Sequence, residues 1–181
     1  GNNRPVSASN ILVDPSFEWE YSIASNVPAA VYGKAGTDRG ATYAIDSRVA
    51  HHGTHSLRMT NPAYGKGSAV QFYPPPIKIG KHYIMSVWAK ADSRTIKNSS
   101  GKVIFRMDLG GYASKEFELT DEWERYELSA TYLEPLRNWA IKCGLELISE
   151  GTAWFDLVEV VADMDFAVEP LENEPTAVRV I

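Results

Sequence analysis

The chain has 181 residues, of which 44% are hydrophobic and 23% are charged, and its net charge is −5. This length fits one domain with a sizeable core, and the charge balance argues against a disordered chain and against nucleic acid or anionic lipid as the main partner. The longest apolar runs are only as long as strands, so no membrane span is predicted. We expect one folded unit over residues 10–163, an N-terminal linker over 1–9, and a C-terminal linker or edge segment over 164–181.

Short runs of β-branched and aromatic residues predict strands throughout this unit. In chain order, the predicted strands cover residues 41–46, 56–60, 69–73, 82–89, 102–109, 124–131, 141–147 and 154–161. Turn-forming residues such as Gly110-Gly111 separate several of them, and no stretch shows an amphipathic helical stripe. Many short strands at this spacing predict an all-β fold, a two-sheet antiparallel β-sandwich of the jelly-roll type.

Alternation within the strands predicts which side chains face the core. Phe105 belongs to the apolar face of residues 102–109, whereas Arg106 and Asp108 belong to the opposite face. In residues 141–147, Lys142 and Glu146 alternate with an apolar set that includes Cys143. Cys143 is the only cysteine, which excludes a disulfide framework, and its apolar surroundings predict a buried small side chain.

Five motifs, in order, resemble those of carbohydrate-binding modules of families 4, 9 and 22, which have a galactose-binding-domain-like jelly-roll fold. They are NILVDPSFE at 10–18, HGTHSLRM at 52–59, YIMSVWAKA at 83–91, WERY at 123–126 and WFDLV at 154–158. The resemblance implies a non-catalytic module that tethers a larger secreted, periplasmic or cell-surface protein to an oligo- or polysaccharide. A neighbouring catalytic domain of the same chain, such as a glycoside hydrolase, would be the second partner.

The same resemblance implies a structural Ca²⁺ ion that joins the N-terminal segment to the last strand. Glu18 and Asp156 would supply carboxylates, and backbone carbonyls near Thr54 would supply further oxygens, which are the ligands that Ca²⁺ prefers. Asp156 lies between apolar residues on a strand that looks buried, so it needs a partner. The alternative partner is a turn near Gly53 whose backbone amides would hydrogen-bond to the carboxylate.

Sugar binding needs exposed aromatic rings for the apolar face of a pyranose, with polar groups beside them for the hydroxyls. Trp88, Trp123 and Trp154 lie within the motifs and are assigned to packing. The candidate ligand-binding residues lie on predicted loops or on the polar faces of predicted strands, and they are Trp19, Tyr32, Arg106, Asp108, Tyr112, Trp139, Lys142 and Glu146.

Two other functions stay open at this point. The main alternative is a structural or protein-interaction jelly roll that packs on its parent enzyme and binds no sugar. A polysaccharide lyase or hydrolase is less well supported, because no nucleophile-elbow, zinc-protease, phosphate-loop or dinucleotide motif occurs. The close spacing of His51, His52 and His55 raises zinc as an option, but Gly53 argues against a helix that would present them together.

Overall fold

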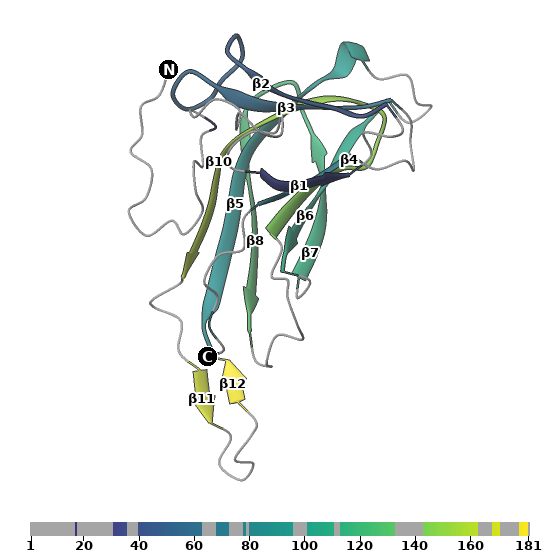
Figure 1. Ribbon diagram of the computed structural model, residues 1–181. Helices are drawn as coiled ribbons and strands as arrows, with labels where there is room; N and C mark the ends of the chain where they lie inside the picture. The colour runs from purple at the N-terminus through teal and green to yellow at the C-terminus, as the bar shows by residue number, and fades with distance from the viewer. Residues whose placement is uncertain are drawn as a thin grey trace.

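A computed structural model shows a chain whose described part consists almost entirely of strands (Figure 1). The described residues, to which every structural statement refers, are 17, 31–35, 40–62, 68–72, 78, 80–95, 101–110, 113–132, 143–162, 168–170 and 178–180. Helical structure within these ranges is confined to one 3₁₀ turn, η2 (Ser93–Thr95). No helix in the described ranges has the length and apolarity needed to cross a membrane.

Ten of the strands form two antiparallel five-stranded sheets. In spatial order, sheet A consists of β1 (Val31–Ala35), β4 (Ser68–Phe72), β9 (Cys143–Leu147), β6 (Val103–Leu109) and β7 (Ala113–Leu119). Sheet B consists of β2 (Thr42–Asp46), β3 (Ser56–Asn61), β10 (Gly151–Ala162), β5 (His82–Asp92) and β8 (Glu124–Thr131). The predicted all-β jelly-roll sandwich is confirmed.

The core lies between these two sheets. On β6, the buried residues alternate with partly exposed ones along the whole strand, as the sequence predicts. The Phe105 ring on β6 contacts the Phe155 ring on β10, with centroids 5.3 Å apart, so the two layers meet through their inward faces. Phe17 from the N-terminal motif is also fully buried, and its ring lies 6.2 Å from that of Phe72 on β4. Cys143 is buried as predicted.

Strand β10 is the central strand of sheet B, as its apolar sequence predicts, and it carries an irregularity. Its register against β5 shifts between Asp156 and Glu159, which indicates a β-bulge. Within the bulge Leu157 has a φ of 47°, a left-handed conformation that costs a branched residue roughly 1–3 kcal/mol. The bulge therefore sets the direction in which the Asp156 side chain leaves the strand.

Several strands were not predicted. β1 and β7 are edge strands of sheet A, and β7 is polar and exposed over most of its length, so it lacks the apolar alternation that reveals a strand. β11 (Val168–Pro170) pairs with β12 (Val178–Val180) inside the segment predicted as a linker or edge segment. In Figure 1, this pair lies beyond one end of the two main sheets.

Candidate functional site

The outward face of sheet A brings together three of the predicted ligand-binding residues. Arg106 and Asp108 project from β6 on the side opposite the buried Phe105, as predicted. Arg106 is the register partner of Glu146 on β9 and of Glu116 on β7. Its guanidinium donates to Glu146 Oε2 at 3.2 Å and to Glu116 Oε1 at 2.7 Å. We call Arg106, Asp108, Glu116 and Glu146 the Arg106 surface.

The Arg106 surface is charged and accessible to solvent. The side chains of Arg106 and Glu146 keep 38% and 36% of their surface exposed. The hydrogen bond to Glu116 raises the pKa of Arg106, so the guanidinium is a permanent donor. Because these ion pairs are solvated, each contributes little to stability. They leave polar groups of both kinds, donors and acceptors, aligned across three neighbouring strands.

The carboxylate of Asp156 is completely buried and accepts three backbone N–H groups. The N–H groups of His51 and His52 each donate to Oδ2 at 2.7 Å, and that of Leu157 donates to Oδ1 at 2.7 Å. This is the turn-amide contact that the sequence raised as the alternative to calcium. Burial raises the pKa of Asp156 to about 7, although the three donors favour the ionised form. We call Asp156 with these donors the Asp156 clasp.

The Asp156 clasp contains one of the predicted calcium ligands, Asp156 itself. The turn whose His52 N–H donates to Asp156 also contains Thr54. A carboxylate has about four lone-pair directions, of which the clasp uses three, so one is left for a cation. Glu18 lies outside the described residues. Among the described residues, no three His, Cys, Asp or Glu side chains gather where they could hold a metal ion.

The tryptophans of the motifs lie on the outward face of sheet B and at its edge, and not between the sheets. Trp88, Trp123 and Trp154 are all partly exposed. Packing does occur, but with a surface partner: the His51 ring stacks on Trp88 with centroids 3.9 Å apart and lies 5.6 Å from Trp123. Trp154 lies between buried Ala153 and Phe155 on β10, so its side chain points outward from sheet B.

A cavity of about 380 Å³ that the sequence did not predict opens beside Trp154. Its polar lining comes from Lys90 and Asp92 on β5, Arg94 on η2 and Asp121 in the turn before β8. These residues are far apart in the chain, and no motif links them. We call this the Trp154 cavity.

The remaining predicted ligand-binding residues cannot be placed beside either surface. Trp19, Tyr112, Trp139 and Lys142 lie outside the described residues. Tyr32 lies on β1, so its backbone belongs to the same sheet as the Arg106 surface.

Comparisons with known proteins identify the fold. No protein-family model and no curated protein matches the sequence. Among solved structures, the chain is similar to TmCBM61 in complex with β-1,4-galactotriose, at 17% identity over 85% of this chain and 99% of that one, with a TM-score of 0.58. It is also similar to the C-terminal family 22 carbohydrate-binding module of Clostridium thermocellum Xyn10B, at 16% identity over 87% and 96%, with a TM-score of 0.54.

A family 16 carbohydrate-binding module matches in the same way, at 17% identity over 84% of this chain and 99% of that one, with a TM-score of 0.52. The chain therefore has the β-sandwich fold of carbohydrate-binding modules, as the motifs predicted. Because these identities are low, the function has to be argued from the surfaces of this chain.

Proposed function

We propose that the chain is a non-catalytic carbohydrate-binding module and that the Arg106 surface contacts the glycan. The observation that carries the proposal is the alignment of Arg106, Asp108 and Glu146 on the outward face of one sheet. Sugar hydroxyls need donors and acceptors at once, and this surface offers a guanidinium between carboxylates. The likeness to TmCBM61, whose structure contains β-1,4-galactotriose, supports the choice of ligand class.

Such a module would hold a larger secreted protein on its polysaccharide, next to a catalytic domain of the same chain. Tethering raises the effective concentration of the substrate at that domain without adding any chemistry of its own. Aromatic rings would complete the glycan contact, and Trp139, Tyr112, Tyr32 and Trp19 stay predictions for that role, as does Lys142 for the polar contacts. An extracellular, periplasmic or cell-surface location follows from the same proposal.

A structural Ca²⁺ ion belongs to this proposal as well. Asp156 would contribute its remaining lone pair, backbone carbonyls near Thr54 would contribute oxygens, and Glu18 would contribute the second carboxylate. The support is the fully buried carboxyl group of Asp156, whose contacts in the clasp are backbone N–H groups. When bound, the ion would stabilise the ionised form of this group and tie the N-terminal segment to β10.

Binding can be tested by affinity electrophoresis in gels that contain xylan, galactan or mixed-linkage glucan. We expect Arg106→Ala to lose most of the retardation that the wild type shows. Arg125→Ala is the matched control, because Arg125 also makes an exposed ion pair, with Glu127 at 2.6 Å, on β8 of the opposite sheet. Equal retardation of Arg106→Ala and wild type would contradict the role of the Arg106 surface.

A further inference from the structure

The Trp154 cavity lies on the opposite side of the sandwich from the Arg106 surface. Trp154 projects outward from sheet B, and Arg106 projects outward from sheet A. The cavity volume of about 380 Å³ falls in the range of roughly 300–1,000 Å³ typical of small-molecule sites. None of its polar lining residues belongs to the Arg106 surface.

The indole of Trp154 is held in one orientation. Its Nε1–H donates to Asp46 Oδ2 at 3.0 Å, and Asp46 also accepts from Arg58 Nη1 at 3.3 Å and from the Arg48 N–H at 2.8 Å. Asp46 is only 8% exposed, so this anchor is shielded from water. Because the polar edge of the indole is satisfied there, the ring lines the cavity as a fixed flat surface.

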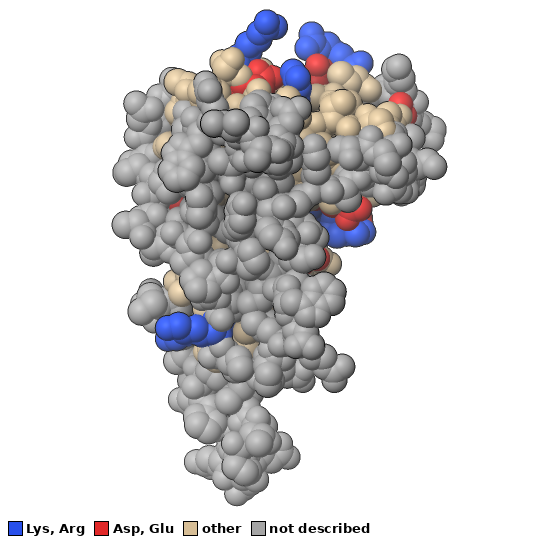
Figure 2. Space-filling model, in the orientation of Figure 1, with Lys and Arg blue, Asp and Glu red and all other residues tan. Residues whose placement is uncertain are grey.

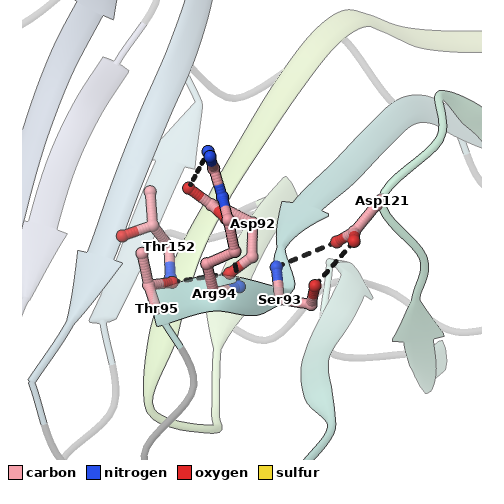
Figure 3. Close-up of polar contacts among 6 residues, drawn as sticks. All are labelled: Asp92, Ser93, Arg94, Thr95, Asp121 and Thr152. Atoms are coloured by element: carbon pink, nitrogen blue, oxygen red, sulfur yellow. Dashed lines mark hydrogen bonds and ion pairs between the residues drawn. The ribbon is translucent and has the colours of Figure 1, made fainter.

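The 3₁₀ turn η2, which carries Arg94 of the cavity lining, is held from both sides (Figure 3). On one side of η2, Ser93 donates to Asp121 through its N–H at 2.9 Å and through its hydroxyl at 2.6 Å. On the other side, the Thr152 N–H donates to Thr95 Oγ1 at 2.9 Å. The short turn is therefore pinned to β10 and to the loop before β8, and a ligand would meet a site that needs little ordering.

The charges around the cavity balance. Arg94 donates to Asp92 through Nε at 2.9 Å and through Nη2 at 3.1 Å. The hydrogen bonds from Arg94 and from Ser93 lower the pKa values of Asp92 and Asp121, respectively, so both carboxylates act as acceptors. The cations Lys90 and Arg94 and the carboxylates of Asp92 and Asp121 therefore give the cavity a lining of two positive and two negative charges. Figure 2 shows the same intermixing of basic and acidic side chains at the end of the molecule where β2 and β3 lie.

Lys90 lies beside the indole of Trp154 in the cavity lining. It faces Trp154 across the β5–β10 pair, and its ammonium lies 5.9 Å from the centroid of the indole. The charge of Lys90 also helps to lower the pKa values of Asp92 and Asp121. A cation over an exposed ring is a weak contact, so a ligand can take its place on the ring and receive a hydrogen bond from the displaced ammonium.

We propose that the Trp154 cavity is a second saccharide-binding site and that it takes a neutral pyranose unit. The indole offers a surface for the C–H face of the sugar. Carboxylates accept from vicinal hydroxyls, and Lys90 and Arg94 donate to the hydroxyl oxygens. A lining of zero net charge favours a neutral sugar over a uronate or an acidic peptide. The site shares only its ligand class with the proposed function, and it would make the module bivalent across its two sheets.

The test follows the indole N–H signal of Trp154 by NMR in ¹⁵N-labelled protein, identified by its loss in Trp154→Phe. The probes are xylotriose, cellotriose and β-1,4-galactotriose, with galacturonate and a tetraglutamate peptide as anionic comparisons. We expect one of the neutral sugars to shift this signal and Arg94→Ala to weaken that binding about tenfold. Arg94 is 87% exposed, so this variant is expected to fold. Arg125→Ala should bind as the wild type does.

The outcomes separate the two sites. A Trp154 shift that persists in Arg106→Ala supports the second site. Glycan retardation that depends on Arg106 without any Trp154 shift overturns the second site and leaves the proposed function standing. A shift only with galacturonate or with the peptide overturns the assignment to a neutral sugar, as does the absence of a shift with every probe.

Discussion

The Asp156 carboxylate accepts the backbone N–H of His51 at 2.7 Å across 105 positions of sequence. The same His51 stacks its ring on Trp88, which is the register partner of Asp156 on β5. One turn is thus attached to sheet B twice, through its backbone and through its side chain. The backbone attachment begins at the bulge in β10, where Leu157 adopts its left-handed conformation, and the side-chain attachment is to the neighbouring strand β5. The clasp therefore links the loop after β2 to the central strand.

We expect Asp156→Ala to lower the free energy of unfolding by about 3–5 kcal/mol. The substitution would leave the N–H groups of His51, His52 and Leu157 without their acceptor in a site that excludes water. Urea unfolding followed by tryptophan fluorescence measures the change. Glu127→Ala on exposed β8 is the control and should change stability by less than about 0.5 kcal/mol. A loss below about 1 kcal/mol in Asp156→Ala would contradict the structural role of the clasp.

The pKa of Asp156 predicts a pH dependence of a defined sign. Its value rises from 3.8 to about 7 on folding, so between these pH values the folded chain binds a proton that the unfolded chain has released. Stability from this group is therefore complete below pH 3.8 and is lost as pH rises to 7, by roughly 4 kcal/mol at most.

The lowered pKa values of Asp46, Asp92 and Asp121 act in the opposite direction, so the contribution of Asp156 must be isolated by difference. Urea unfolding of the wild type and of Asp156→Asn between pH 4 and 8, with chelator present, gives that difference. We expect the stability advantage of the wild type to shrink as pH rises. An advantage that grows with pH would show that the folded site prefers the ionised form.

If the proposed Ca²⁺ ion binds, it should change both the pH dependence of the stability and the stability itself. A cation beside Asp156 favours the carboxylate, so the pH dependence should become flatter. Calcium at 100 times its dissociation constant should add about 2.7 kcal/mol to the stability. Thermal scans in Ca²⁺, in Mg²⁺ and in chelator measure the effect, and Mg²⁺ serves as the matched control because it takes a smaller, octahedral site. Identical transitions in all three buffers would remove calcium from the proposal.

Asn61 is predicted to stabilise the contact between the two sheets. It is 1% exposed at the end of β3, and its Nδ2 donates to the carbonyls of Leu147, Ile148 and Ser149, each at 3.1 Å. We expect Asn61→Ala to cost about 2–3 kcal/mol. Asn61→Asp should cost more, because a carboxylate of similar shape brings no donor and faces three carbonyl oxygens. Equal stability of the two variants in urea unfolding would argue against this role of the amide.

Alternating sequence predicted strands best where one face is apolar and the other polar. The bounds predicted for residues 124–131 are those of β8, and the inward and outward faces of β6 were predicted side chain by side chain. β7 was not predicted, because this edge strand buries too few side chains for apolar and polar residues to alternate along it. Motif membership of Trp88, Trp123 and Trp154 suggested packing, although all three are partly exposed.

The local pattern of apolar and polar residues was enough for the strand content, the core faces and the burial of Cys143, because a strand needs only its neighbours in sequence to define its two faces. The contacts between residues that are distant in the sequence depend on how the two sheets pack together. The amides that reach Asp156, the glutamates around Arg106 and the charges beside Trp154 come from distant strands and loops. No local pattern encodes such meetings, because they depend on strand order and register.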